Sequence, residues 1–140
     1  MSNTKVVFDV NVLNTMKLFD RITHASLKDC IIEEERIIFV VNEGELGKAL
    51  GKQAVNVKRL FETLKKKIKI VEFNSDKLKF ISNFIHPLKV DNISEKDGIV
   101  ILESHDTKTK GLLIGRAAQN LRKLEEYVRR YYDVKEIKIV

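Results

Sequence analysis

The chain has 140 residues, of which 26 are Lys or Arg and 20 are Asp or Glu, with one Cys and no Trp. Its length allows one or two small domains with a buried core. Its composition, with 44% hydrophobic and 33% charged residues, is typical of an ordered globular protein and excludes a disordered tail. No apolar run reaches the roughly 18 residues of a membrane span, and one cysteine excludes an internal disulfide and a multi-thiolate metal site. We expect no signal peptide and a cytoplasmic location.

The first half of the chain predicts a helix, two strands, two helices and a strand. The expected elements are a helix around 12–19, strands over 28–32 and 36–41, a short helix over 45–50, a longer helix from about Ala54, and a strand over 67–73. The longer helix is expected to turn an apolar stripe towards the core: Val57, Leu60, Phe61 and Leu64. Residues 1–9 are expected either to add a strand or to be loose.

The second half repeats this order. The first helix must stop at His86, because Pro87 disfavours helical geometry in the residue before it. After it we expect strands over 88–93 and 99–102, a turn over 95–98, a short helix over 107–114, a long helix beyond Gly115 and a strand over 134–140. The long helix is expected to turn four side chains inward: Leu121, Leu124, Val128 and Tyr131.

A duplicated segment supports this reading. Residues 50–60 and 114–124 align without gaps at an offset of 64, with four identities and five conservative exchanges in 11 positions. Both halves also close on the tetrapeptide Ile-Lys-Ile-Val. The order αββααβ therefore occurs twice, which predicts two α+β domains, 1–74 and 75–140, each with a three-stranded sheet and helices packed on one face.

Positive charge gathers in the two copies of this segment. Residues 48–69 carry eight basic residues and one acid, and residues 108–130 carry seven basic residues and two acids, so the rest of the chain sums to −6. One such cluster is readily explained as a solvated helix face. Two clusters at matching places favour a surface for an acidic partner, and we expect Lys52 and Arg116 to lie on one face of the molecule.

Each cluster contains a loop of small residues between two helices. The first loop is Gly51, Lys52, Gln53 and Ala54, and the second is Gly115, Arg116, Ala117 and Ala118. The positive end of the following helix suits phosphate, with Lys52 or Arg116 supplying charge. A simple helix–helix turn that needs glycine is the alternative, and the duplication favours the phosphate site.

The chain resembles the K homology (KH) family of RNA-binding domains in its type II form. More closely, it is similar to the archaeal stand-alone relatives of the transcription factor NusA, which consist of two consecutive type II KH domains. The resemblance covers about residues 12–140 and is carried by these segments: 18–23, 29–31, 36–41, 50–52, 56–60, 71–72 and 111–116.

The resemblance implies single-stranded RNA as the ligand, gripped by both loops. Lys52 and Arg116 would face phosphate, and Lys58 and Arg122 would extend the track along the next helix. Asn56 and Asn120 would either donate to phosphate or cap the helix. KH loops usually end in Gly, and here both end in Ala, which is strained if that position needs a positive φ and suitable if it starts the helix at a negative φ.

Other chemistry-bearing residues are interpreted as structural or surface residues. His24, His86 and His105 have no helix-spaced partner for a metal, and Cys30 lies in an apolar run that predicts a small buried hydrophobe. Tyr131 and Tyr132 invite base stacking, although one of them is expected to face the core. We expect no enzyme, no cofactor and no small-molecule substrate.

The leading hypothesis is an RNA-binding factor in transcription termination, antitermination or elongation. The transcriptional role and RNA polymerase as a partner come from the resemblance alone. Two alternatives remain open: an RNA-binding factor of ribosome assembly or RNA decay, and a protein–protein adaptor whose loops have lost RNA.

Overall fold

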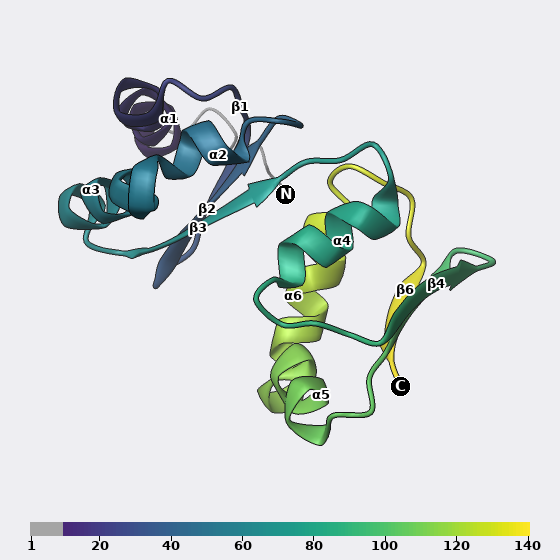
Figure 1. The fold of residues 1–140 in the computed structure, drawn as a ribbon. Coiled ribbons are helices and arrows are strands. Elements are labelled where there is room, and N and C mark those ends of the chain that lie inside the picture. Colours follow the sequence, from purple (N-terminus) through teal and green to yellow (C-terminus); the bar gives the residue numbers. More distant parts are fainter. Residues whose placement is uncertain (1–9) are drawn as a thin grey trace. The chain divides into compact units, whose positions relative to one another are not determined.

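The structure, a computed structural model, describes residues 10–140, so both expectations for residues 1–9 lie outside its described part. The chain divides into two compact units, Met1–Asn74 and Ser75–Val140 (Figure 1). In the described residues, each unit runs through a helix, two strands, two helices joined by a short 3-10 turn, and a final strand. The α+β class and the two three-stranded sheets predicted from the sequence are confirmed.

The first unit forms a sheet of order β1-β2-β3, in which β1 pairs antiparallel and β3 pairs parallel with β2. Its elements are α1 (Val10–Thr23), β1 (Leu27–Ile32), β2 (Arg36–Val41), α2 (Leu46–Leu50), η2 (Lys52–Ala54), α3 (Val55–Leu64) and β3 (Lys67–Glu72). Because β2 and β3 are parallel, the chain must return along the sheet between them. The helices α2 and α3 form this crossover, and the loop of residues 51–54 lies at its midpoint.

The core of the first unit lies between its helices and one face of the sheet. Ile37, Phe39 and Val41 alternate along β2 towards this face. Phe19 of α1 stacks on Phe39, with the ring centroids 4.4 Å apart. Cys30 belongs to the same buried cluster at 5% exposure, so its interpretation as a small buried hydrophobe is confirmed.

The helix α3 is rotated relative to the predicted apolar stripe. Its buried residues are Asn56 and Leu60, which lie about one turn apart and define the centre of the buried face. Phe61, which was expected to point inward, is 51% exposed because it lies roughly 100° around the helix from Leu60. The prediction is therefore wrong for Phe61, and a polar residue takes the central inward position.

The second unit repeats the topology with the sheet order β4-β5-β6. The strand β5 pairs antiparallel with β4 and parallel with β6. The elements of the second unit are α4 (Lys77–Ile85), β4 (Asn92–Lys96), β5 (Ile99–Glu103), α5 (Thr107–Ile114), η3 (Arg116–Ala118), α6 (Gln119–Val128) and β6 (Glu136–Ile139). The helix α4 ends at Ile85 with His86 as its C-cap, as Pro87 predicts.

Two strands of this unit differ from the prediction. The strand expected over 88–93 runs over Asn92–Lys96, because the Leu88 N–H bonds back to the Ile85 carbonyl and closes a turn after α4. The turn expected over 95–98 narrows to Asp97 and Gly98, both at positive φ, as a tight two-residue hairpin requires. The strand expected over 134–140 is shorter, at Glu136–Ile139.

The inward side of α6 also differs from the prediction. The helix ends at Val128, because the Arg130 and Tyr131 N–H groups bond to carbonyls three residues back and tighten the chain into turns. Tyr131 therefore lies outside the helix, and Tyr127 is buried within it. The Tyr131 and Tyr132 rings pack at 5.5 and 5.6 Å from the Phe80 ring, so both serve the core of this unit.

Candidate nucleic-acid interface

The loop between α2 and α3 has an unusual backbone. Gly51 has φ 74° and ψ 175°, and Gln53 and Ala54 follow at φ 54° and 58°, in the left-handed region. The Gly51 N–H bonds to the Gly47 carbonyl, and the Ala54 N–H bonds to the Gly51 carbonyl. The chain thus leaves one helix, reverses its twist for two residues and enters α3.

The loop between α5 and α6 reproduces this geometry 64 residues later. Gly115 has φ 75° and ψ 176°, and Ala117 and Ala118 have φ 53° and 60°. Its two backbone hydrogen bonds join Gly115 to Gly111 and Ala118 to Gly115, as in the first copy. The duplication seen in the sequence is therefore a duplication of backbone conformation.

The final alanine of each loop was compatible with either a positive φ or a helical, negative φ, and the structure shows the positive one. Ala54 and Ala118 both have positive φ and precede the first helical residue, so neither starts a helix in ordinary geometry. An L-residue in this region costs about 1–2 kcal/mol relative to right-handed geometry. Each loop therefore holds strain that the surrounding contacts must offset.

An asparagine behind each loop supplies such a contact. The Asn56 Nδ2 donates to the Lys48 carbonyl at 3.3 Å, and the Asn120 Nδ2 donates to the Leu112 carbonyl at 2.9 Å. Both acceptors lie near the C-terminal end of the preceding helix, where carbonyls lack helical partners. The amides thus cap the last turn of the preceding helix and tie the two helices together across the loop.

Each asparagine also explains why its loop begins with glycine. A Cβ on Gly51 would stand 2.8 Å from the Asn56 Nδ2, and a Cβ on Gly115 would stand 2.6 Å from the Asn120 Cγ. Both distances are shorter than real contacts allow. Glycine is required here by space as well as by its positive φ.

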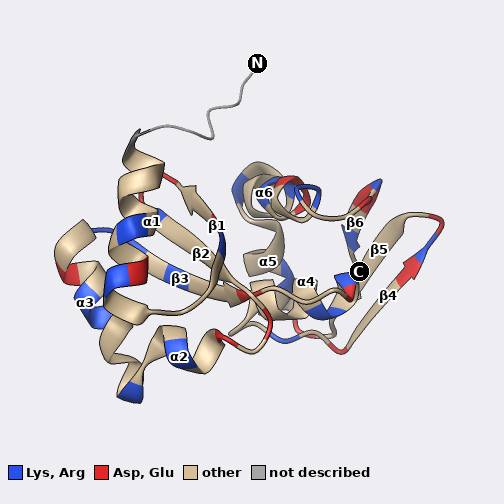
Figure 2. Cartoon of the chain, turned by 90° about the horizontal axis from the view of Figure 1, so that it is seen from above, with Lys and Arg blue, Asp and Glu red and all other residues tan. Residues whose placement is uncertain are grey.

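The cations expected at the loops are exposed. Lys52 and Arg116 occupy the second loop position, and Lys58 and Arg122 lie farther along α3 and α6. Their side chains make no hydrogen bond or ion pair with residues 10–140. Figure 2 shows the basic residues on α2 and α3. Each loop thus presents an unpaired cation beside the positive end of a ten-residue helix.

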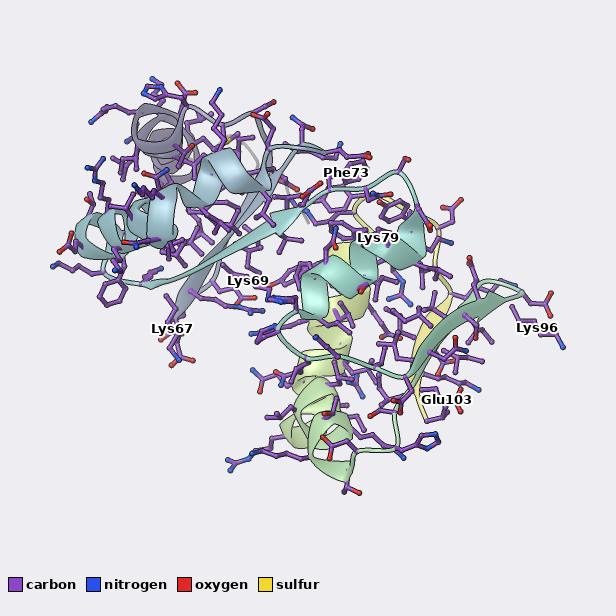
Figure 3. The ribbon with its side chains drawn as sticks, viewed as in Figure 1. Lys67, Lys69, Phe73, Lys79, Lys96 and Glu103 are labelled. Atoms are coloured by element: carbon purple, nitrogen blue, oxygen red, sulfur yellow. The ribbon has the colours of Figure 1, made fainter. Side chains whose placement is uncertain are left out.

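Other basic residues of the two segments have structural roles. The Lys66 Nζ donates to the Glu33 carbonyl, and the Arg129 Nε donates to the Val134 carbonyl. Lys69 leaves β3 as a half-buried side chain (Figure 3), and burial, with a smaller contribution from Arg36, lowers its pKa to about 8. It loses its charge at a lower pH than an exposed lysine, so Lys52 is the better phosphate ligand.

The described residues contain neither a candidate metal centre nor a helix able to span a membrane. Among residues 10–140, no three His, Cys, Asp or Glu side chains gather closely enough to hold a metal ion. Every helix in this part of the chain is too short or too polar to cross a bilayer.

Comparisons with known proteins identify the family of the chain. The KH domain family matches residues 16–79. The "Probable transcription termination protein NusA" of Methanococcus vannielii is 32% identical over 129 residues, which are 89% of this chain and 74% of that protein. The protein of the same name from Halococcus morrhuae is 30% identical over 138 residues, which are 96% of this chain and 99% of that protein. The chain belongs to the archaeal NusA family.

Family membership extends over both units. The NusA of Methanocaldococcus jannaschii is 29% identical over 139 residues, which are 97% of this chain and 76% of that protein. The crystal structure of APE1850 matches with a TM-score of 0.72 and 29% identity, covering 95% of this chain and all of that one. The resemblance to the NusA family expected from the sequence is confirmed.

Proposed function

We propose that this NusA-family chain is a tandem type II KH protein that grips single-stranded RNA with residues 51–54 and 115–118. The observation that carries the proposal is the repeated loop. The same left-handed backbone occurs twice, each time with an exposed cation at its second position that has no side-chain partner within residues 10–140. Strained backbone residues cluster at functional sites, and a helix N-terminus beside a basic side chain suits an anion.

The loop residues divide into two roles. Lys52 and Arg116 contact phosphates, and the helix dipoles of α3 and α6 add to their charge. Gly51 and Gly115 allow close packing against the asparagine amides, which hold the loop in shape. A KH module of this kind holds about four nucleotides of single strand.

The biological setting that we propose is transcription termination, antitermination or elongation, with RNA polymerase as a protein partner. Its support is the name that the relatives share, transcription termination protein. A role in ribosome assembly or RNA decay would use the same loops, and co-purification with polymerase or with ribosomal subunits separates these possibilities.

The test of RNA binding is a pair of charge reversals with matched controls. Lys52→Glu and Arg116→Glu should each weaken binding of single-stranded RNA at the altered loop by about 10- to 150-fold, since a charged phosphate contact is worth roughly 1.5–3 kcal/mol. Lys17→Glu on α1 and Lys96→Glu on β4 make the same charge change at other exposed lysines and should have little effect.

Binding should also weaken as salt rises, because bound lysine and arginine displace counterions from phosphate. The slope of log affinity against log salt should be shallower for the loop variants than for the controls. If all four variants bind RNA as the wild type does, the RNA clamp is wrong and the protein–protein adaptor takes its place.

A further inference from the structure

The exposed ring of Phe61 marks a second place where the first unit can meet a ligand. Phe61 lies on α3, which begins directly after the loop of residues 51–54, and half of its surface is open to solvent. Seven residues separate it from Ala54, which is about 10 Å along a helix. A strand held at the loop can reach this ring.

Cations flank the ring. Lys58 lies three residues before Phe61, so their side chains are neighbours on the helix surface. Lys65 follows the last helical turn, and its N–H bonds to the Phe61 carbonyl at 2.8 Å. The side chains of both lysines are exposed and unpaired within the described residues, and Glu62 is the single acid between residues 48 and 69. An aromatic face between two free ammonium groups is complementary to a base with its phosphates.

In the second unit, the side chains at the corresponding positions form hydrogen bonds to the backbone of the same unit. At the offset of 64, Phe61 corresponds to Glu125 and Lys65 corresponds to Arg129. The Glu125 carboxylate accepts the Ile137 N–H at 2.8 Å, and the Arg129 Nε donates to the Val134 carbonyl at 2.9 Å. Side chains that bond within the fold of the second unit thus correspond, in the first unit, to a half-exposed ring and to a lysine whose side chain has no hydrogen bond or ion pair within residues 10–140.

We propose that Phe61, Lys58 and Lys65 form a second contact for single-stranded RNA in the first unit. A base stacks on the phenyl ring, and the two lysines hold the adjoining phosphates. The proposal rests on the proposed function, because the loop of residues 51–54 delivers the strand. At about 3.4 Å per stacked nucleotide, 10 Å adds roughly three nucleotides to the loop's four, so an octamer reaches the ring and a tetramer does not.

A tryptophan reporter tests the contact directly. The chain has no Trp, so the Phe61→Trp variant carries one indole at the proposed stacking position. Saturation with a random-sequence pool of RNA octamers should quench its emission. Leu13→Trp, at a 43% exposed position of α1, should show no quenching under the same conditions. Unchanged Phe61→Trp emission with RNA bound overturns the proposal.

Affinity gives the second readout. In a chain that already carries Arg116→Glu, which weakens the second loop, Phe61→Ala should reduce octamer affinity about 5- to 150-fold, which corresponds to the roughly 1–3 kcal/mol of one base–aromatic stack. It should leave tetramer binding unchanged, and Phe61→Tyr should restore the octamer affinity. Leu13→Ala is the matched control for loss of an exposed apolar side chain.

The outcomes separate this inference from the proposed function. If Lys52→Glu weakens octamer binding and Phe61→Ala does not, the loop binds RNA and the second contact is wrong, which would favour a protein partner for the exposed ring. If the wild-type chain binds neither octamers nor tetramers, both proposals fail.

Discussion

Each candidate loop holds two residues other than glycine in left-handed geometry: Gln53 and Ala54 in the first, and Ala117 and Ala118 in the second. Ala54 and Ala118 occupy left-handed backbone geometry that glycine adopts without a Cβ penalty. Both copies share this choice and the same angles to within about ten degrees. A smaller residue would relieve each loop, so the alanines make it stiffer and less stable than glycine would.

This gives a stability prediction. Ala54→Gly and Ala118→Gly should each raise the free energy of unfolding by about 0.5–1 kcal/mol, because the relief of strain exceeds the added entropy of the unfolded chain. Calorimetric melting temperatures measure the effect. Ala49→Gly is the control, because Ala49 is a buried residue of helix α2 and its replacement should lower the stability by about 1 kcal/mol. A lower melting temperature for the two loop variants would contradict the left-handed geometry.

At the scale of elements, the asparagine amides couple the helices on either side of each loop. Asn56 reaches back eight residues to α2, and Asn120 reaches back eight residues to α5. The helix α2 has five residues, and the Gly51 N–H closes its last turn by bonding to the Gly47 carbonyl. In each copy the asparagine amide thus adds one side-chain hydrogen bond to the two backbone hydrogen bonds that hold the loop.

Removing this bond should loosen the loops. Asn56→Ala and Asn120→Ala should each lower the free energy of unfolding by about 1 kcal/mol, the worth of a typical hydrogen bond. Amide exchange at Gly51 and Ala54, or at Gly115 and Ala118, should become faster, and RNA affinity should fall. Asn14→Ala, at an exposed position of α1, should change none of these. Protected loop amides in the Asn56 and Asn120 variants would show that the amides do not hold the loops.

At the scale of the whole molecule, the question is whether one RNA strand uses both loops. The clustering of charge in matching segments led us to expect Lys52 and Arg116 on one face, and this stays a prediction. A strand that bridges both loops turns the second contact into an intramolecular step.

The prediction is that RNA long enough to reach both loops binds in a 1:1 complex, about 10²- to 10⁴-fold more tightly than octamers do. Titration calorimetry with RNAs of increasing length measures both quantities. Either single loop reversal, Lys52→Glu or Arg116→Glu, should then remove this gain. Two RNA molecules per chain, bound with an affinity independent of length, would instead indicate two separate sites.

The sequence alone determined the order of elements, the duplicated loop and the family resemblance, because these depend on signals that neighbouring residues carry. Periodic apolar residues predict helices and strands, Pro87 ends α4, and glycine marks both loops. The repeat at an offset of 64 placed the same residue types at the same steps of the fold. The expectation that the loop cations form the candidate site also came from this pattern.

The tertiary structure decided what depends on contacts between distant residues. The sign of φ at Ala54 follows from how α2 and α3 meet, and the sequence left both signs open. Leu88 lies in a turn because its N–H bonds to the Ile85 carbonyl, although its residue type suits a strand. The helix α3 buries Asn56 and Leu60, and Phe61 therefore faces solvent. Asn56 can be buried because its side-chain amide donates a hydrogen bond to the Lys48 carbonyl across the loop. The sequence of α3 alone does not reveal this acceptor.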